Sequence, residues 1–463
     1  MNESKDKEDF FIGVDIGTTN IRACLFDSNF KVLYFANERV KLIINSDEEV
    51  VEVDPDDLLF QLRVLLNLSG SIGYCITGIE RFKSAKILKF INAMVTHRFL
   101  VTLHRSEEMK KLLEQNRLAV GCIDTWLLYR LTNGRVFITD PSAISSTGLY
   151  DPFLRDYGRS LLRMIGLPSN VLLPEIMDTT AINAKIDTEF FGERPLRIRA
   201  AAGDAQSAAF GAGCLRNGSL SVCMGTGVFY DAVMGDEPRS TASVDSGLFP
   251  LVGWRINGNY KFLIEGHANC SANLVDWAHR VGLLDVIADA SDIALSAEAG
   301  ESPYYIPGLE DIQAPKSDDI FACGGMLCLR TCTSNAQIVR ALLEAIVFGV
   351  AQIHERCQVD FPDFKPKAIR VSGGVSSNDF ICQQLANLTN LSIERVSDNH
   401  FCASRGAAFL AAIATGKITM TDVQKFVTIE RVFVPEDEKQ RNVTLETFEK
   451  WKNAQKRCQS FYK

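Results

Sequence analysis

The chain has 463 residues, 46% of them hydrophobic and 32 of them glycine, which is enough for two domains of ordinary size with separate cores. Its formal net charge is −8 and it has no dense run of lysine and arginine, which argues against nucleic acid or an anionic membrane surface as the main partner. The composition favours a globular α/β protein that acts on a small molecule.

Three features of the sequence indicate where in the cell the protein is found. Residues 1–10 are charged and contain no apolar stretch, so we expect no secretory signal peptide. The longest apolar runs, 341–351 and 406–416, are shorter than the ~20 residues of a membrane-spanning helix, and we expect buried core helices there. The 13 cysteines are scattered, often within apolar patterns, which favours reduced thiols in a cytoplasmic protein over disulfides or a metal site.

The stretch at 10–27, FFIGVDIGTTNIRACLFD, has an acid, a Gly turn, two hydroxyls and an arginine between two apolar runs. It predicts a strand, a turn and a second strand. The turn N–H groups and the Thr18 and Thr19 hydroxyls could face an anion, and Arg22 could add a positive fork to a phosphoryl oxygen. Asp15, at the end of the first strand, is placed to hold a magnesium ion through water. An ordinary hairpin with a Gly turn is the alternative.

Local signals predict the elements that follow. Residues 31–40 favour a third strand, and Asp54 with Pro55 marks the start of a helix whose leucines share one face. Residues 73–79 are typical of a strand, and 80–117 are basic and helical. Asp124 and Thr125 are expected to cap the helix 125–131, Asn133 and Gly134 to form a turn, and 135–140 a strand.

Two patterns in the middle of the chain carry further polar groups. Residues 196–204 predict a strand that ends in Asp204 at the start of a helix, and open α/β sheets collect their chemistry at such strand ends. Residues 218–231, GSLSVCMGTGVFYD, again predict strand, turn and strand, with Gly225 and Thr226 in the turn. Two such hairpins half a chain apart indicate two similar domains that face each other across a nucleotide. No flexible linker joins them, so we expect a tight hinge near 204–220.

The second half alternates strands and helices. Asn257 and Gly258 predict a hairpin, and Ser334 is expected to cap a long apolar helix. Residues 367–374 predict a strand that runs into a turn at Gly373 and Gly374, with a helix over 376–390. The strand 392–396, a helix over 404–416 and a basic amphipathic segment complete the chain.

Six motifs occur together in one order: DIGTTNIR, GCIDTWLLYRLTNGRVFITDPSAISSTGLYDP, AGDAQSAAFG, MGTGVF, VSGGVSSNDF and SRGAAFLAA. In this combination the chain resembles the FGGY carbohydrate kinases of the actin and Hsp70-like ATPase superfamily, and within them the glycerol kinases, particularly a divergent animal branch. The resemblance implies an α/β fold of two actin-like (ribonuclease H-like) domains with a nucleotide cleft between them. The domains would span 1–213 and 214–463, and the first is internally shortened around 79–120.

The resemblance also implies roles for single residues. Asp15 would organise Mg²⁺, and Asp204 would be the catalytic base that accepts the alcohol proton, with Gln206 beside it at the substrate. The expected contacts to the phosphates and adenosine of ATP are Thr18, Thr19, Arg22, Gly225, Thr226, Gly373, Gly374 and Asn378. This sequence departs from the family at Ser372, where an acid is usual, and at Ala205, where an amide is usual.

Three functions are weighed against one another. The first is an ATP- and Mg²⁺-dependent kinase of glycerol or a related small polyol, and a homodimer is compatible with it. The second is a non-catalytic nucleotide-binding regulator, because the Gln-Arg loop, Trp and aromatic that clamp glycerol in the family have no counterpart where Ile79 runs into 80–82. The third, an ATPase of the actin or Hsp70 kind, is disfavoured because two of the motifs are typical of sugar kinases.

Overall fold

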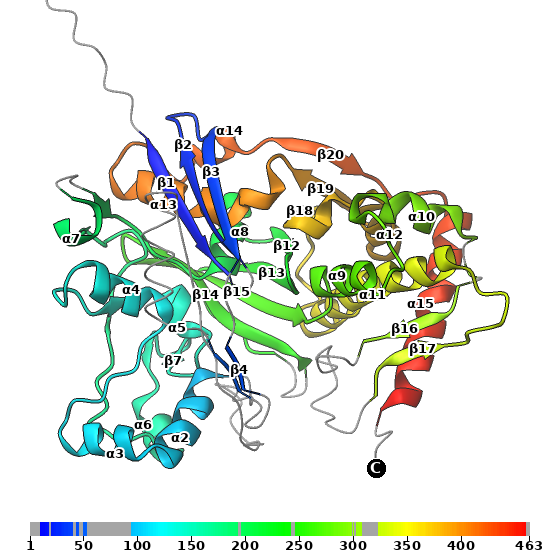
Figure 1. Cartoon of the computed structure of the whole chain (residues 1–463). Helices are drawn as coiled ribbons and strands as arrows, with labels where there is room; N and C mark the ends of the chain where they lie inside the picture. The colour runs from blue at the N-terminus through cyan, green and yellow to red at the C-terminus, as the bar shows by residue number, and fades with distance from the viewer. Residues whose placement is uncertain are drawn as a thin grey trace, which may run out of the picture.

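The computed structural model describes residues 10–17, 20–39, 43–45, 50–52, 94–192, 196–241, 246–298, 300, 302–307 and 323–459. Figure 1 shows a small sheet of N-terminal strands in blue, a large sheet across the middle, and the helices of the last third packed beyond it. Thr18, Thr19 and 53–93 lie outside these residues. So do the predicted helix after Asp54, the predicted strand 73–79 and the first part, 79–93, of the shortened interval.

The first hairpin and the third strand form as predicted. The three strands make one antiparallel sheet in the order β1, β2, β3. Ile21 and Cys24 point to opposite faces of β2 and both are fully buried, so this sheet is covered on both faces at β2. The strands are β1 (Phe11–Ile16), β2 (Asn20–Phe26) and β3 (Val32–Arg39).

Helices and strands of two or three residues make up the rest of the described first half. The elements there are α2 (Val95–Arg105), α3 (Glu107–Glu114), α4 (Ile123–Leu131), α5 (Pro141–Ser145), α6 (Arg159–Met164), α7 (Thr188–Phe191) and α8 (Asp204–Gly211). The strand pairs are β4 (Ile43–Asn45) with β5 (Val50–Glu52), β6 (Ile138–Thr139) with β9 (Glu175–Ile176), β7 (Tyr150–Asp151) with β8 (Asp156–Tyr157), and β10 (Ala184–Lys185) with β11 (Arg197–Ile198).

Two local predictions in this half are wrong in detail. The helix α4 begins at Ile123, and its N-cap is Cys122 without a side-chain cap, because the Asp124 carboxylate instead accepts a hydrogen bond of 2.8 Å from the Thr139 hydroxyl. The predicted strands 135–140 and 196–204 are reduced to β6 and β11. The turn at Asn133 and Gly134 is confirmed, since both residues have positive φ.

A seven-stranded sheet forms the second half, in the order β14, β15, β13, β12, β18, β19, β20. The strand β18 is parallel to both β12 and β19, whereas the other neighbours are antiparallel. The predicted hairpins at Gly225 and at Asn257 are confirmed. The strands are β12 (Leu220–Met224), β13 (Val228–Gly235), β14 (Leu248–Ile256), β15 (Asn259–Ala268), β18 (Ala368–Ser372), β19 (Ser392–Val396) and β20 (Ile429–Phe433).

The helices of the second half pack around this sheet. They are α9 (Ala272–Arg280), α10 (Ala290–Ser296), α11 (Asn335–Asp360), α12 (Asp379–Thr389), α13 (Cys402–Ala414), α14 (Val423–Phe426) and α15 (Glu438–Cys458). The short helices η2 (Ile287–Asp289), η3 (Gly374–Ser377) and η4 (Asn399–Phe401) join them, and β16 (Tyr304–Ile306) pairs with β17 (Gly325–Leu327).

The longest of the apolar helices, α11, is a core helix. Ser334 caps it through a capping box with Gln337, as the sequence predicts. Within the described part of the chain it is the one helix long and apolar enough to span a membrane, but most of that apolar stretch is buried inside the protein. It also carries the buried ion pair of Arg340 and Glu344, 2.7 Å apart. Burial on all sides by the sheet and its neighbours explains its apolar sequence.

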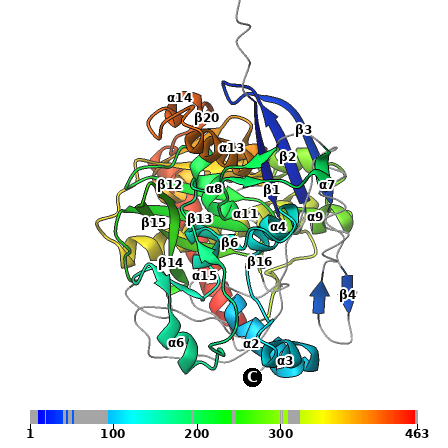
Figure 2. The same cartoon turned by 90° about the vertical axis from the view of Figure 1, so that its left-hand side faces the viewer.

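The two halves meet where α13 lies beside β1 and crosses α8 (Figure 1, Figure 2). Glycine is required at this junction because the backbones touch. A Cβ atom would be 1.7 Å from the Ser404 carbonyl oxygen at Gly13, 1.9 Å from that of Cys402 at Gly211, and 1.9 Å from that of Ser207 at Gly406. The crossing therefore fixes β1 and α8, which carry Asp15 and Asp204, against one helix.

Candidate active site

Asp15 stands near the end of β1, directly opposite Arg22 on β2. The Arg22 Nη1 atom lies 3.4 Å from the Asp15 Oδ2 atom, and both side chains are partly buried. Burial raises the pKa of Asp15 to about 6, and the charge of Asp204 adds to the rise while Arg22 opposes it. Asp15 and Asp204, which are far apart in the sequence, are therefore electrostatic neighbours.

Asp204 is the first residue of α8, following Gly203. Its Oδ1 atom accepts a hydrogen bond of 2.9 Å from the backbone N–H of Ala205. The side chain is open to solvent, although the protein atoms around it raise the pKa of this carboxyl group by desolvation. An accessible carboxylate with a raised pKa at the start of a helix is suited to accepting a proton from a bound ligand.

Asp140 and Ser142, which the sequence analysis missed, hold the backbone next to Asp204. The Asp140 Oδ1 atom accepts a hydrogen bond of 2.7 Å from the Ser142 hydroxyl. The Ser142 oxygen in turn accepts one of 2.9 Å from the N–H of Gly203. Asp140 also caps α5, and that capping pattern was its only sequence signal. The two hydrogen bonds of Ser142, which we call the Ser142 relay, fix the backbone immediately before Asp204.

Gln206 is buried against the turn that precedes Asp204. A Cβ atom at Gly203 would be 2.2 Å from the Gln206 Oε1 atom, so glycine leaves room for the folded-back amide. Ala205 is also buried and adds no polar group. The structure thus places Gln206 in the first turn of α8, two residues after the expected base.

The two Gly turns of the second half follow adjacent parallel strands. Cys223 of β12 pairs with Ser372 of β18, so Gly225 and Gly373 leave the sheet at the same edge. Gly373 has φ of 84°, a conformation that favours glycine. Gly225 and Gly373 are half-buried, whereas Thr226 is exposed. This edge collects backbone groups and one hydroxyl in the way a phosphate site requires.

The turn after β18 continues through Gly374 to Asn378. Gly374 is exposed, and Asn378 caps α12 by accepting a hydrogen bond of 3.1 Å at Oδ1 from the Ile381 N–H. The amide nitrogen of Asn378 is the part of this side chain that the cap does not use. Asn378 therefore serves the fold as well as any ligand.

Arg22 also faces the second half. Burial lowers the pKa of His400, and the charge of Arg22 lowers it further. The His400 ring lies beside Gly374, 3.4 Å from where a Cβ atom would be. The charge of Arg22 on the first hairpin therefore acts on His400, which lies beside the turn after β18.

A buried acidic pair, which the sequence analysis also missed, interacts electrostatically with Asp204. Asp231 on β13 and Glu265 on β15 are direct cross-strand neighbours. Burial and the charge of Asp204 raise the pKa of both carboxyl groups. The charge of Asp231 raises the pKa of Glu265 further, whereas the contact with Glu265 lowers the pKa of Asp231. An acid inside an otherwise apolar strand was the available sequence signal.

The sequence matches one family along most of the described part of the chain. Residues 84–211 match the N-terminal domain of the FGGY family of carbohydrate kinases, and residues 220–415 match its C-terminal domain. The chain belongs to this family, and it is a kinase.

Among curated relatives, glycerol kinase 5 from Homo sapiens is 33% identical over 402 residues, covering 87% of this chain and 74% of the relative. Glycerol kinase 5 from Danio rerio is 28% identical over 533 aligned positions, covering 100% of this chain and 98% of the relative. That alignment is longer than the 463 residues of this chain, so the Danio rerio relative has residues without a counterpart here.

Two solved structures show the same fold. The Plasmodium falciparum glycerol kinase with ADP superposes with a TM-score of 0.81 at 21% identity, covering 97% of this chain and 98% of that one. The gluconate kinase from Lactobacillus acidophilus superposes with a TM-score of 0.75 at 19% identity, covering 98% and 99%. The predicted α/β fold of two actin-like domains is confirmed.

Proposed function

We propose that this kinase transfers the γ-phosphoryl group of ATP to a hydroxyl of glycerol or a related small polyol, giving glycerol 3-phosphate from glycerol. The observation that carries the proposal is the approach of Asp15 and Asp204, which belong to different elements and lie close enough for the charge of Asp204 to raise the pKa of Asp15. The Gly turns at 225 and 373 follow the carboxyl ends of the adjacent parallel strands β12 and β18. We infer that the two domains divide near residue 213, between the two family matches.

The carboxylates fit a hydrated magnesium ion. Within the described ranges, no three His, Cys, Asp or Glu side chains are grouped so that they could hold a metal. Mg²⁺ commonly keeps several waters and takes one or two carboxylates together with substrate phosphates. Asp15 would hold the ion through water, and the ion would neutralise charge on the phosphates. The raised pKa of Asp15 supports this role, because a nearby cation offsets the repulsion from Asp204.

Asp204 would act as the general base. The substrate hydroxyl oxygen forms a bond to the γ-phosphorus, the bond from that phosphorus to the β,γ-bridging oxygen of ATP breaks, and the hydroxyl proton moves to Asp204. ADP leaves with the bridging oxygen. Little covalent help is needed for this reaction, so positioning and charge neutralisation supply most of the rate. The Ser142 relay would hold Asp204 in position, and Gln206 would support the substrate.

The nucleotide would lie across both halves. Arg22 from one side and Gly225 with Thr226 from the other would hold the transferring phosphates. Thr18 and Thr19 would join Arg22, but they lie outside the described residues. Adenosine would lie on Gly373 and Gly374, with its base near Asn378. We further infer a cytoplasmic location, where buried free thiols such as those of Cys214 and Cys382 stay reduced.

A nucleotide-binding regulator is the second candidate, and the sequence favours it at one point. The interval after Ile79 lacks the family's clamp for glycerol hydroxyls, and Ala205 removes an amide beside the base. Each lost hydrogen bond contributes ~0.5–1.5 kcal/mol, so the loss of several weakens glycerol binding by orders of magnitude. We therefore expect this chain to bind nucleotide and to phosphorylate glycerol poorly.

Two measurements on the full chain separate these functions. Calorimetric titration with ADP, with and without Mg²⁺, tests the nucleotide site, and a coupled assay with ATP and glycerol tests transfer. Magnesium-dependent ADP binding with slow turnover at saturating glycerol supports a kinase with a weakened substrate site. ADP binding with no turnover on any small polyol supports the regulator. A micromolar KM for glycerol with normal turnover would mean that 80–117 supply a substitute clamp.

A further inference from the structure

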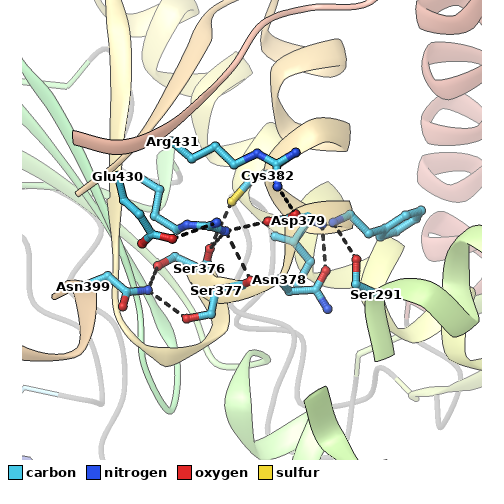
Figure 3. A network of polar contacts seen from close by, with 12 residues as sticks. Ser291, Ser376, Ser377, Asn378, Asp379, Cys382, Asn399, Glu430 and Arg431 are labelled. Atoms are coloured by element: carbon cyan, nitrogen blue, oxygen red, sulfur yellow. Dashed lines mark hydrogen bonds and ion pairs between the residues drawn. The ribbon is translucent and has the colours of Figure 1, made fainter. Parts of the chain in front are cut away.

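The turn from Gly373 to Asn378 rests on a polar network built by the next strand and the short helix after it (Figure 3). Arg395 comes from β19, and Asn399 begins η4. Both residues are almost completely buried, with 6% of their surface exposed in each case. Neither side chain can therefore touch a nucleotide that lies on the outer side of the turn.

Arg395 holds the last part of the turn from below. Its Nη1 atom lies 3.2 Å from the Ser376 carbonyl oxygen, 3.2 Å from the Ser377 carbonyl oxygen and 2.8 Å from Asp379 Oδ1. These contacts turn two carbonyl groups inward, away from the edge where ligand would lie. They also join the turn to the first residue of α12.

Asn399 holds the first part of the turn. Its backbone carbonyl accepts a hydrogen bond of 2.9 Å from the Gly373 N–H, and its Nδ2 atom lies 3.2 Å from the Gly373 carbonyl oxygen. The same Nδ2 atom is 2.8 Å from the Ser376 hydroxyl and 3.0 Å from that of Ser377. Asn399 thus bonds to both the N–H and the carbonyl group of Gly373 and to the hydroxyl groups of two residues later in the turn. Figure 3 shows the contacts of Asn399 with Ser376 and Ser377.

The charge of Arg395 is already matched inside the network. Its Nη2 atom lies 3.3 Å from Glu430 Oε1, and Asp379 is shared between Arg395 and Arg431. A buried, compensated guanidinium adds little attraction for phosphates at the surface. Its planar fork lets Nη1 reach the turn carbonyls while Nη2 pairs with Glu430, a geometry that the single ammonium group of a lysine does not reproduce.

We propose that Arg395 and Asn399 are positioning residues for the adenosine of the bound nucleotide, because together they fix the Gly373–Asn378 turn in the shape that meets it. The inference rests on the proposed function, since it takes the nucleotide site at this turn as given. It assigns affinity for the nucleoside part to two residues that never contact it.

Arg431 provides a matched control. It pairs with the other carboxylate oxygen of Asp379 and is half exposed, but among the described residues it forms no hydrogen bond to the turn. Arg431→Gln removes one of the two guanidinium groups that pair with Asp379 and leaves the hydrogen bonds to the turn carbonyls intact. Arg395→Gln removes the other guanidinium from Asp379 and the hydrogen bonds to the turn carbonyls as well. The difference between the two variants reports the contacts that Arg395 alone makes, to the carbonyl groups of Ser376 and Ser377 and to Glu430.

The experiment is calorimetric titration of the full-length wild type, Arg395→Gln, Arg395→Lys, Asn399→Ala and Arg431→Gln with Mg-ADP and with magnesium pyrophosphate. We expect Arg395→Gln and Asn399→Ala to bind Mg-ADP at least tenfold more weakly, Arg395→Lys to fall between them and wild type, and Arg431→Gln to bind within twofold of wild type. Pyrophosphate affinity should stay within twofold throughout, because only adenosine reaches the turn. A merely structural role would lower the melting temperature without this selectivity.

Different results would overturn either the role of Arg395 and Asn399 or the nucleotide site itself. Wild type that binds Mg-ADP while Arg395→Gln and Asn399→Ala bind it equally well would overturn the inference alone. Equal losses for ADP and pyrophosphate would overturn it too, because the residues would then act on the whole site. Wild type without ADP binding would overturn the proposed nucleotide site and the inference with it. If Arg395→Gln does not fold, Asn399→Ala and Arg395→Lys give the same comparison.

Discussion

Gly373 lies against the backbone of Met224, so closely that a Cβ atom on Gly373 would be 2.4 Å from the Met224 carbonyl oxygen. The contact joins the ends of β18 and β12, the two parallel strands from which the Gly turns leave. Because φ of Gly373 is 84°, any other residue there would also strain the backbone. The shape of the proposed nucleotide edge therefore depends on the absence of one side chain.

Gly373→Ala is expected to destabilise the fold and weaken nucleotide binding. Backbone strain of this kind costs ~1–3 kcal/mol, and the clash with Met224 adds to it. Gly374→Ala is the matched control for stability, since its Cβ atom would meet only the His400 ring at 3.4 Å. Urea unfolding of both variants, together with Mg-ADP titration of Gly373→Ala, checks the prediction. Equal behaviour of the two variants would show that the close contact has no such consequence.

Gly406→Ala should disturb the crossing of α13 and α8. The new Cβ atom would lie 1.9 Å from the Ser207 carbonyl oxygen, and forced packing of this kind costs about 3 kcal/mol. Gly349→Ala in α11 is the control, because its Cβ atom would meet Ala268 at an ordinary 3.6 Å. That change should stabilise by ~0.5–1 kcal/mol through helix propensity. Chemical denaturation gives both values, and a stable Gly406→Ala protein would contradict the tight crossing.

The stability of the fold should depend on the protonation of Asp15. Its pKa is about 6 in the folded chain against 3.8 as a free side chain, so the folded state binds more protons between about pH 4 and pH 6. This contribution therefore falls as the pH rises through that window. Asp15→Asn should match wild type near pH 4 and exceed it above pH 6 by roughly 2–3 kcal/mol. Denaturation curves at several pH values test this, and a variant less stable than wild type at pH 8 would contradict it.

Asp204→Asn should fold normally and bind Mg-ADP, but transfer should fall because an amide cannot accept the hydroxyl proton. Loss of a general base typically lowers the rate by ~10²–10⁴. Asp363→Asn, on an exposed residue, is the control for removing a carboxylate elsewhere. Turnover is measured with whichever polyol wild type phosphorylates. A folded Asp204→Asn protein with the rate of wild type would assign the base to another residue.

The amino-acid sequence determined the local elements, because their signals lie within a few residues of each other. Alternating apolar residues around a Gly turn predicted the hairpins at 10–27 and 218–231, and Ser334 predicted the start of α11. The order of the motifs predicted the family and the fold. The helix start at Asp124 was missed because its carboxylate bonds to Thr139, a partner from beyond the helix.

Only the tertiary structure decided which of these elements meet. Local periodicity does not say that α13 packs on β1 or that β18 lies beside β12, since such pairings join residues hundreds of positions apart. The neighbourhood of Asp15 and Asp204, the Ser142 relay and the support from Arg395 all follow from those pairings. A carboxylate or an arginine looks the same in the sequence whether it is solvated or buried, and its pKa and role depend on the groups that folding brings around it.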